Sequence, residues 1–320
     1  MQIFITGASG FVGKAATKAL TKNHKVIAMA RSEKSAQVVT ELGANASRCA
    51  LGSVKLEHLQ GCDVVVHCAA FVEEWGSEEQ FWQTNVVGTQ QLLDTAKEAG
   101  VKRFIHISTE AVLFYGQHLR NIDETYPYPD KTPILYSRTK AAAEKAVINA
   151  NSVDFTTICL RPRFIWGPGD KTIVPVIKEM AACGKFMWIG GGHYQTSTVY
   201  IDNLVHAITL ALTKGQGGKT YFITDNEDQD MRKFLTLMLK TQGVDLPAKS
   251  APRFIARGAA RIVESMWRML AIKKQPPITR HAAYVMSSDC TLKIDRAQQD
   301  LGYEPIVSVS QGLENMTENT

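Results

Sequence analysis

The chain has 320 residues, of which 45% are hydrophobic and 21% charged, so we expect a packed core in one large domain or two modest ones and exclude wholesale disorder. Its net charge of +5 is too small for a nucleic-acid-binding surface, and its six scattered cysteines contain no CxxC pair, so we expect no nucleic-acid partner, no metal site and no disulfide framework. No signal peptide follows Met1 and no run of about 18 apolar residues occurs, which predicts a cytoplasmic protein.

Short apolar runs alternate with helical patterns through the first half of the chain. Apolar strands that alternate with helices predict a parallel sheet with helices on both faces. We therefore expect an α/β fold with a Rossmann-like, doubly wound parallel sheet. The predicted strands are 2–6, 25–30, 63–70, 103–108, 154–162 and a weaker one near 47–51, and the predicted helices are 11–22, 32–42, 78–99 and 134–150.

The pattern changes after Pro162, where loops rich in glycine and proline begin. A strand at 197–201, a helix from Asp202 and a strand at 219–224 could return to the same sheet, and the residues from about 225 are mostly helical. We predict a first domain at 1–164, to which 198–224 returns. The remaining segments, 165–197 and 225–320, should form a smaller and mostly helical C-terminal lobe.

A glycine-rich loop, "FITGASGFVGKAA", lies between the first strand and the first helix. Gly7 permits a sharp turn, Gly10 lets a pyrophosphate approach the backbone, and Gly13 lets the helix pack closely on the strand. The amides of the first helical turn and the helix dipole then face the phosphates. The loop therefore predicts a dinucleotide site in the first domain, which includes Ser9, Phe11 and Val12.

The end of the second strand discriminates between the two nicotinamide dinucleotides. An acidic residue there would bind the ribose hydroxyl of NAD, but this chain has Arg31 followed by Ser32. A guanidinium beside a hydroxyl suits the 2′-phosphate of NADP. We therefore expect NADP as the cofactor, with NAD as the second choice. A solvated arginine on a surface turn is the alternative.

The segment "ILYSRTKAAAEKAV" places Tyr136 four residues before Lys140, on one face of a predicted helix. A lysine ammonium there would lower the pKa of the phenol from its usual value near 10 and make Tyr136 an acid or base at neutral pH. Ser108 and Thr109 end a predicted strand at the sheet edge that also carries the glycine loop. Thr109 could bind a substrate oxygen while Tyr136 moves the proton. A hydroxyl pair that satisfies the backbone is the alternative.

These motifs, with "TNVVGTQ" (84–90), "LRPRFIWGPGD" (160–170) and "YIDNLVHAI" (200–208), resemble the extended short-chain dehydrogenase/reductases. Within them the chain is similar to the 3β-hydroxysteroid dehydrogenase-like branch, which includes bacterial 2-alkyl-3-oxoalkanoate reductases. The resemblance implies Tyr136 as general acid/base, Lys140 as the ligand of the nicotinamide ribose and Thr109 as a substrate ligand. It also implies cofactor contacts by Ala69, Ala70, Ser108, Tyr136, Lys140, Pro162 and Ile165.

Two departures from the family pattern bear on this expectation. Ala50 stands where many relatives have an aspartate that contacts adenine, so the adenine edge must find another partner or bind less specifically. The segment "VLFYG" replaces the "VYG" that is usual in epimerases, which argues against a sugar-nucleotide substrate.

Bulky apolar residues surround the predicted site and favour a hydrophobic substrate, although each could equally belong to the core. Arg163 could receive a substrate carboxylate, or could form a structural ion pair. The predicted substrate contacts are Trp75, Thr109, Arg163, Phe164 and Trp188.

The basic, amphipathic segment 252–274 could lie on a membrane of anionic lipid, or could cap the substrate cleft with a solvated basic edge. We favour the cap, because the segment lies inside the fold rather than at a terminus. The resemblance also implies a homodimer, for which 78–99 and 134–150 are candidate pairing helices.

Together these features predict an NADP(H)-dependent oxidoreductase that interconverts a ketone and a secondary alcohol on a hydrophobic substrate, either a 3-oxo or 3β-hydroxysteroid or a long-chain 2-alkyl-3-oxoalkanoate. The first domain would bind NADP and the second lobe the substrate. The alternatives are a sugar-nucleotide epimerase or dehydratase that retains NAD, and a dinucleotide-sensing protein without catalysis.

Overall fold

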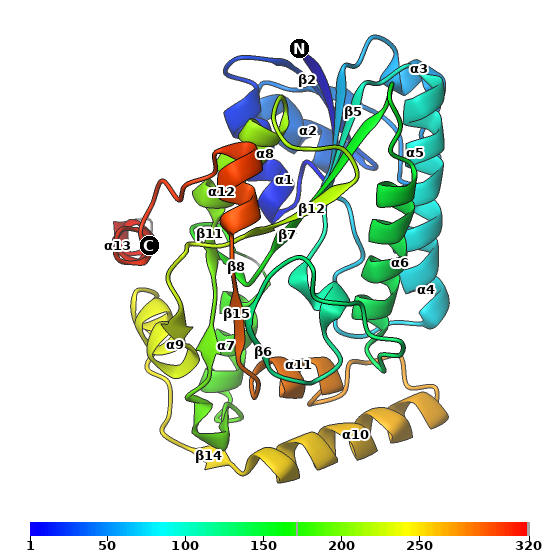
Figure 1. The fold of residues 1–320 in the computed structure, drawn as a ribbon. Coiled ribbons are helices and arrows are strands. Elements are labelled where there is room, and N and C mark those ends of the chain that lie inside the picture. Colours follow the sequence, from blue (N-terminus) through cyan, green and yellow to red (C-terminus); the bar gives the residue numbers. More distant parts are fainter. Residues whose placement is uncertain (171, 319–320) are drawn as a thin grey trace.

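The centre of the protein is a seven-stranded parallel sheet (Figure 1), seen in a computed structural model that describes residues 1–170 and 172–318. Residue 171 and residues 319–320, which belong to the predicted second lobe, lie outside the described residues. The strand order β12-β7-β5-β4-β1-β2-β3 starts in the middle and winds toward both edges, which confirms the predicted Rossmann-like fold. The strands are β1 (Gln2–Thr6), β2 (Lys25–Met29), β3 (Asn45–Ser47), β4 (Val64–His67), β5 (Arg103–Ile107), β7 (Thr156–Pro162) and β12 (Lys219–Ile223).

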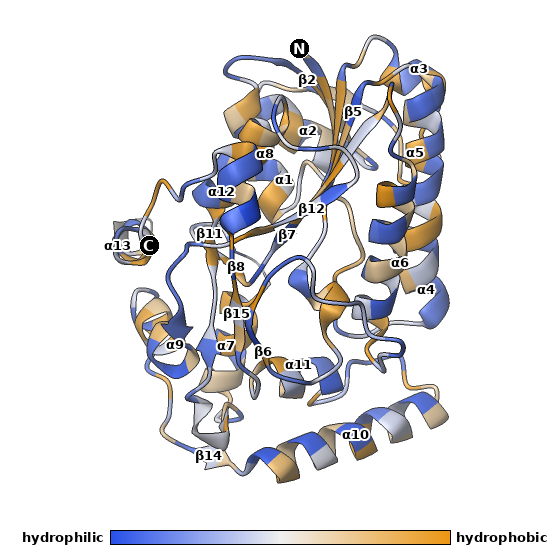
Figure 2. Ribbon diagram, in the orientation of Figure 1, coloured by the Kyte–Doolittle hydropathy of each residue, from blue (hydrophilic) through white to orange (hydrophobic). Residues whose placement is uncertain are grey.

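Helices cover both faces of this sheet because successive side chains of a strand point to opposite sides. In β1, Ile3 and Ile5 pack in one core cluster and Phe4 packs in another. Apolar residues gather on the central strands, and polar residues alternate with apolar ones along the covering helices (Figure 2). The first cluster includes α1 (Phe11–Leu20), α2 (Glu33–Glu41) and α8 (Ile201–Ala211), and the second includes α3 (Leu56–Leu59), α5 (Gly88–Glu98) and α6 (Leu135–Asn149).

The predicted helix at 78–99 is divided into three parts. A short α4 (Glu78–Trp82) is followed by the π-helical turn η1 (Gln83–Val87) and then by α5. Such a turn frequently accompanies a functional position in a helix. Here it contains Asn85, whose side chain is described with the site below.

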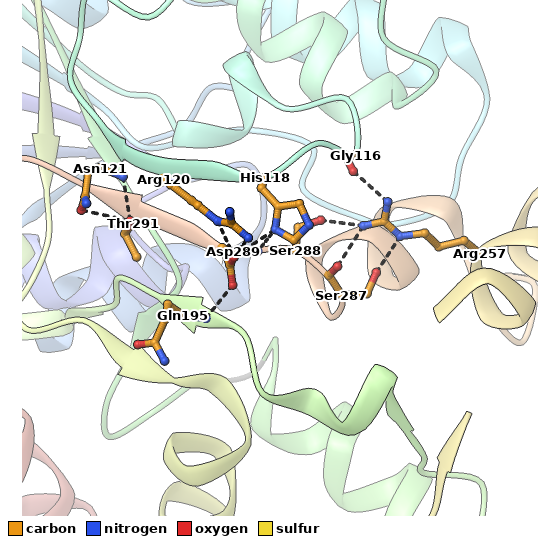
Figure 3. Close-up of polar contacts among 10 residues, drawn as sticks. All are labelled: Gly116, His118, Arg120, Asn121, Gln195, Arg257, Ser287, Ser288, Asp289 and Thr291. Carbon is orange, nitrogen blue, oxygen red and sulfur yellow. Dashed lines mark hydrogen bonds and ion pairs between the residues drawn. The ribbon is translucent and has the colours of Figure 1, made fainter. Parts of the chain in front are cut away.

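A second sheet, of order β13-β10-β15-β6, lies below the main sheet in Figure 1. Leu119 of β6 pairs with Cys290 of β15, although 171 positions separate them. The Asp289 carboxylate joins three segments at this point, because it accepts hydrogen bonds from Arg120 Nε at 2.7 Å and from the Gln195 backbone N–H at 2.9 Å (Figure 3). The strands are β6 (Leu119–Ile122), β10 (Gln195–Thr196), β13 (Gln229–Asp230) and β15 (Cys290–Leu292).

The predicted strand at 197–201 does not extend the main sheet. It is shortened to β11 (Val199–Tyr200), which pairs with β8 (Ile165–Trp166), whereas β12 does join the main sheet. A further pair links β9 (Trp188–Ile189) with β14 (Ser250–Ala251). The remaining helices are η2 (Glu110–Leu113), α7 (Val174–Ala182), η3 (Gly190–Gly192), α9 (Met231–Lys240), α10 (Arg253–Met269), α11 (Arg280–Val285), α12 (Asp295–Leu301) and α13 (Val309–Glu318).

Candidate active site

The glycine loop joins β1 to α1 at the carboxyl edge of the main sheet. Gly7 has a φ of +68°, and a Cβ on it would lie 2.7 Å from the backbone N of Ala69, so a side chain is excluded there. A Cβ on Gly13 would lie 2.2 Å from the Gly7 carbonyl oxygen, which explains why α1 can approach the loop so closely. Gly10 begins α1 without a side-chain cap. The neighbouring Ser9 is exposed, and Phe11 and Val12 are half-buried.

Arg31 and Ser32 follow β2, and both side chains are exposed. The Ser32 hydroxyl caps α2 by accepting a hydrogen bond from the Ser35 backbone N–H at 3.2 Å. Glu33 pairs with Arg48 Nη1 at 3.0 Å, so a second guanidinium lies near the start of α2. This end of β2 therefore presents basic side chains and a hydroxyl at the surface.

Lys140 is buried on α6, and its ammonium is directed to the backbone of β5. Its Nζ donates to the Ile107 carbonyl oxygen at 2.8 Å and lies 3.3 Å from Nε2 of His106. Burial lowers the pKa of Lys140 to about 8. The lysine thereby connects α6 to β5, the strand that Ser108 and Thr109 follow.

Tyr136 is half-buried on the same helix and forms a hydrogen bond with Thr109. Burial raises the pKa of Tyr136, the nearby Glu110 carboxylate raises it further, and the hydrogen bond with Thr109 opposes both effects. The expectation that Lys140 lowers this pKa therefore needs correction. The i, i+4 spacing holds, but the Lys140 ammonium interacts with Ile107 and His106 rather than with the phenol.

Thr109 belongs to a buried polar chain that ends in an ion pair. Its hydroxyl accepts from the Ala111 backbone N–H at 3.1 Å and donates to Glu110 Oε2 at 2.9 Å. The other carboxylate oxygen, Oε1, accepts from Arg163 Nη1 at 2.6 Å. Arg163, predicted as a carboxylate ligand, is thus already paired with a carboxylate of the chain itself.

His281 is a residue that the sequence analysis missed. It lies on α11 in the C-terminal lobe, and its ring centroid is 5.8 Å from that of Tyr136. Burial lowers the pKa of His281, while the charges of Glu74 and Glu110 oppose this effect. No local pattern could have identified His281, because it stands alone in the sequence and about 145 residues after Tyr136.

The loop after β4 is held in place by Asn85. Its side-chain oxygen accepts from the Phe71 backbone N–H at 2.7 Å, and its Nδ2 donates to the Phe71 carbonyl oxygen at 3.1 Å and to Thr139 Oγ1 at 3.2 Å. These contacts tie the loop containing the half-buried Ala69 and Ala70 to α6. Asn85 therefore positions the loop that faces the glycine turn.

The remaining predicted residues lie in three places. Ser108 is buried just after β5, and its hydroxyl has no hydrogen-bond partner among the described residues. Pro162 ends β7, and the half-buried Ile165 starts β8. Between them Phe164 adopts a left-handed φ of +43°, a conformation that costs a non-glycine residue energy and here joins β7 to β8.

Two predicted substrate residues have partners within the C-terminal lobe. Trp75 Nε1 donates to the Ile272 carbonyl oxygen at 3.1 Å, and the Arg268 guanidinium lies 4.6 Å from the Trp75 ring centroid. Trp188 is buried and donates to the Pro247 carbonyl oxygen at 2.9 Å. Trp75 therefore joins the loop after β4 to the end of α10, whereas Trp188 packs inside the lobe. Within the described ranges, no cluster of three or more His, Cys, Asp or Glu side chains could hold a metal.

Comparisons with known proteins show the family and the fold to which the chain is similar. The model of the 3-beta hydroxysteroid dehydrogenase/isomerase family matches residues 4–253. A 4-hydroxy-2-methyl-3-oxo-4-farnesyl-3,4-dihydroquinoline-1-oxide ketoreductase of Stigmatella aurantiaca is 39% identical over 98% of this chain and 95% of its own length. A 2-alkyl-3-oxoalkanoate reductase of Stenotrophomonas maltophilia is 33% identical over 99% of this chain and 98% of its own.

Among solved structures, UDP-glucuronic acid 4-epimerase from Bacillus cereus in complex with NAD has the same fold. It has a TM-score of 0.77 and 22% identity over 100% of this chain and 98% of its own.

Proposed function

Because the chain belongs to the 3-beta hydroxysteroid dehydrogenase/isomerase family and is an NAD(P)-dependent oxidoreductase, we propose that it interconverts a ketone and a secondary alcohol on a hydrophobic substrate with NADP(H). The proximity of Tyr136, on α6, to Thr109, which follows β5, carries this proposal. A proton-donating phenol and an orienting hydroxyl would then act together beyond the end of β5, at the sheet edge where the glycine loop also lies.

The residues around the glycine loop fit a dinucleotide. Gly7 and Gly13 leave no room for side chains of their own, and the first turn of α1 has no side-chain cap, so its amides can bind phosphate oxygens. When bound, the nicotinamide supplies or accepts the hydride. We propose that the pyrophosphate is held by Gly7, Ser9, Gly10, Phe11, Val12 and Gly13, and that Ala69, Ala70, Ser108, Pro162 and Ile165 contact the rest of the cofactor.

We propose NADP rather than NAD because Arg31 and Ser32 are exposed at the end of β2, where an acidic residue would favour NAD. Titration of the purified protein should give a Kd for NADPH at least about tenfold below that for NADH, and Arg31→Asp should reverse the preference. Equal affinities for the two cofactors in the wild type would remove this part of the proposal.

Tyr136 acts as the general acid in the direction of reduction. Its raised pKa keeps the phenol protonated at neutral pH, so it can give a proton to the developing alkoxide of the substrate. In this structure the Thr109 hydroxyl donates to Glu110, and we propose that with substrate bound it donates to the substrate oxygen instead and so orients it. Lys140 uses one N–H for Ile107 and directs a second toward His106, which leaves a third for the nicotinamide ribose.

A hydrophobic substrate, of the 3-oxosteroid or long-chain 2-alkyl-3-oxoalkanoate type, is supported by the activities of the relatives and by apolar side chains near the site. We propose that Trp75 and Phe164 contact this substrate directly. Trp188 and Arg163 have partners of their own within the chain, and we propose that they shape the surroundings of the substrate.

The test is NADPH oxidation at 340 nm with steroids, 3-oxo acids and simple ketones. Turnover with one of these classes, lost in Tyr136→Phe while NADPH binding is kept, supports the proposal. Conversion of a sugar nucleotide without net use of cofactor would identify an epimerase instead, and NADPH binding without any turnover would favour a sensing protein. Near-normal turnover of Tyr136→Phe would refute the mechanism.

We also propose a homodimer that pairs through α5 and α6. A groove of about 510 Å³ runs between these helices and is lined by both polar and apolar side chains, among them Leu93, Asp94 and Lys145. Light scattering of the purified protein should give about twice the mass of 35.3 kDa. The variant that disrupts the dimer should be Lys145→Glu, because Lys145 is exposed, whereas Leu93 is buried and its replacement would disturb the core.

A further inference from the structure

The helix α10 is amphipathic, but most of its large apolar side chains face solvent instead of the protein. On its inner side the buried residues Ala256, Ala260 and Glu264 are small or polar, and Val263 and Trp267 are half-buried. A surface helix of a globular protein normally does the reverse. Two of the outward residues, Phe254 and Met269, are 77% and 78% exposed. We define the apolar stripe of α10 as Phe254, Ile255, Ile262, Met266, Met269 and Leu270, all of which are exposed.

The orientation of α10 is fixed by its polar inner side. Arg257 makes four hydrogen bonds, to the Ser287 hydroxyl at 2.7 Å, the Ser287 carbonyl oxygen at 3.0 Å, the Ser288 hydroxyl at 2.6 Å and the Gly116 carbonyl oxygen at 2.9 Å (Figure 3). Glu264 accepts from the Arg280 backbone N–H at 2.8 Å. Rotation of α10 to bury the apolar stripe would break all of these bonds. The basic edge that the sequence analysis expected to be solvated is therefore partly directed inward.

Along residues 253–274 the exposed charges are of one sign. Arg261, Lys273 and Lys274 are exposed at its flank and end. Glu264 is the only acidic residue between 253 and 274, and it is buried. The outer side of this segment is thus apolar and basic, without an exposed carboxylate. An apolar stripe with flanking cations is complementary to a bilayer interface that contains anionic headgroups.

The dimensions of α10 suit a helix that lies in the plane of a membrane. Its 17 residues make it about 25 Å long, and in Figure 1 it forms the lower border of the molecule, along one side. Within residues 1–170 and 172–318, no helix is long and apolar enough to span a bilayer. Contact with lipid would therefore be peripheral, through one helix face.

The same helix is connected to the proposed active site. Its C-terminal extension accepts a hydrogen bond from Trp75 through the Ile272 carbonyl oxygen, and the chain then continues into α11, where His281 lies against Tyr136. A bilayer at α10 would lie next to the segments that surround the site. A hydrophobic substrate dissolved in the bilayer could then enter without crossing water.

We propose that the apolar stripe of α10 docks the protein on the surface of a membrane containing anionic lipid, so that a lipid-dissolved ketone reaches the site from that side. The role in substrate entry rests on the proposed function, whereas the docking itself does not. A second copy of the chain is the other possible occupant of the stripe, and the experiment distinguishes it.

The test is co-sedimentation of the purified full chain with sucrose-loaded vesicles of phosphatidylcholine alone or with 30% phosphatidylglycerol. We expect binding to the anionic vesicles at least about tenfold stronger than to the neutral ones, and weaker in 0.5 M salt. Ile262→Ser/Met269→Ser and Lys273→Glu/Lys274→Glu should each reduce binding at least about tenfold. The matched control Val153→Ser/Ile306→Ser removes two exposed apolar side chains elsewhere and should bind as the wild type does.

Two results would overturn the proposal. One is equal binding of wild type and the stripe variant to anionic vesicles. The other is a wild-type dimer in sedimentation velocity that becomes a monomer in Ile262→Ser/Met269→Ser and does not bind vesicles, because the stripe would then be a subunit interface. NADPH oxidation with a short, water-soluble ketone should be unchanged in the stripe variant. Vesicle binding needs no turnover, so failure of the proposed function would be recognised separately.

Discussion

Replacing Arg163 with methionine should destabilise the fold by about 3–5 kcal/mol, the usual cost of breaking a buried ion pair by removal of one partner. The side chains of Arg163 and Glu110 are 6% and 7% exposed, and Nη1 lies 2.6 Å from Oε1. Methionine cannot donate a hydrogen bond, so Glu110 would keep only the Thr109 hydroxyl among these contacts. A buried carboxylate that loses its cation bears most of this cost.

The assay is urea unfolding followed by tryptophan fluorescence at pH 7. Arg138→Met is the matched control, since Arg138 forms an exposed pair with Glu78 and should cost no more than about 1 kcal/mol. The double variant Glu110→Gln/Arg163→Met removes both charges and should recover at least about 1 kcal/mol of the loss. A loss below about 1 kcal/mol for Arg163→Met, or no recovery in the double variant, would refute the reasoning.

The same variant separates the two roles considered for Arg163. As a partner of Glu110, it acts on Tyr136 and Thr109 indirectly, so Arg163→Met should lower turnover of carboxylated and uncharged ketones by the same factor. A loss confined to carboxylated ketones would instead make Arg163 a substrate ligand.

Three further predictions concern the site and its support. Gly13→Ala should weaken NADPH binding at least about tenfold, measured by fluorescence titration, because the new Cβ would lie 2.2 Å from the Gly7 carbonyl oxygen. The control is Gly258→Ala on α10, where a Cβ would meet no other atom, and this variant should unfold no more easily than the wild type. His67 is buried with a pKa lowered to about 3 by burial and then by Lys140, so the unfolded state binds a proton that the folded state does not. The contribution of His67 to stability should be constant above about pH 6.5 and fall toward pH 3 by about 5 kcal/mol, and a flat urea midpoint between pH 7 and 4 would contradict this. His281→Phe should keep NADPH affinity but change the pH profile of kcat; an unchanged profile would leave this ring with a packing role only.

The parts of the site that could be predicted are those encoded by neighbouring residues. The glycine loop follows directly on a strand and precedes a helix, and Tyr136 and Lys140 are one helical turn apart, so local spacing places all of them. The direction in which the Lys140 ammonium points could not be predicted, because it depends on the Ile107 carbonyl oxygen of a strand about 30 residues earlier. For that reason the expectation that Lys140 lowers the pKa of Tyr136 is wrong.

The features that could not be predicted depend on contacts between distant segments of the chain. The partner of Arg163 is Glu110, a residue 53 positions away whose burial no periodicity indicates. The strands β6 and β15 have only four and three residues, too few for a period of two to stand out, and they are defined by pairing with each other. For α10 the periodicity is visible in the sequence, and it allows either a membrane-facing apolar side or a cap with a solvated basic edge. The usual pattern of surface helices favours the cap, because it does not reveal which side the contacts of Arg257 and Glu264 turn inward.

The pairing of β6 with β15 also constrains how the protein can be made. β6 occupies the border of its sheet and has β15 as its neighbour there, yet β15 is synthesised near the very end of the chain. During translation the backbone N–H and C=O groups of β6 stay unpaired until β15 has been synthesised, and such unpaired groups are a template for aggregation. A fragment that stops at Arg253, where the family match ends, would keep β6 in this state permanently. We therefore expect such a fragment to precipitate, and the C-terminal residues to be as necessary for solubility as the dinucleotide fold itself.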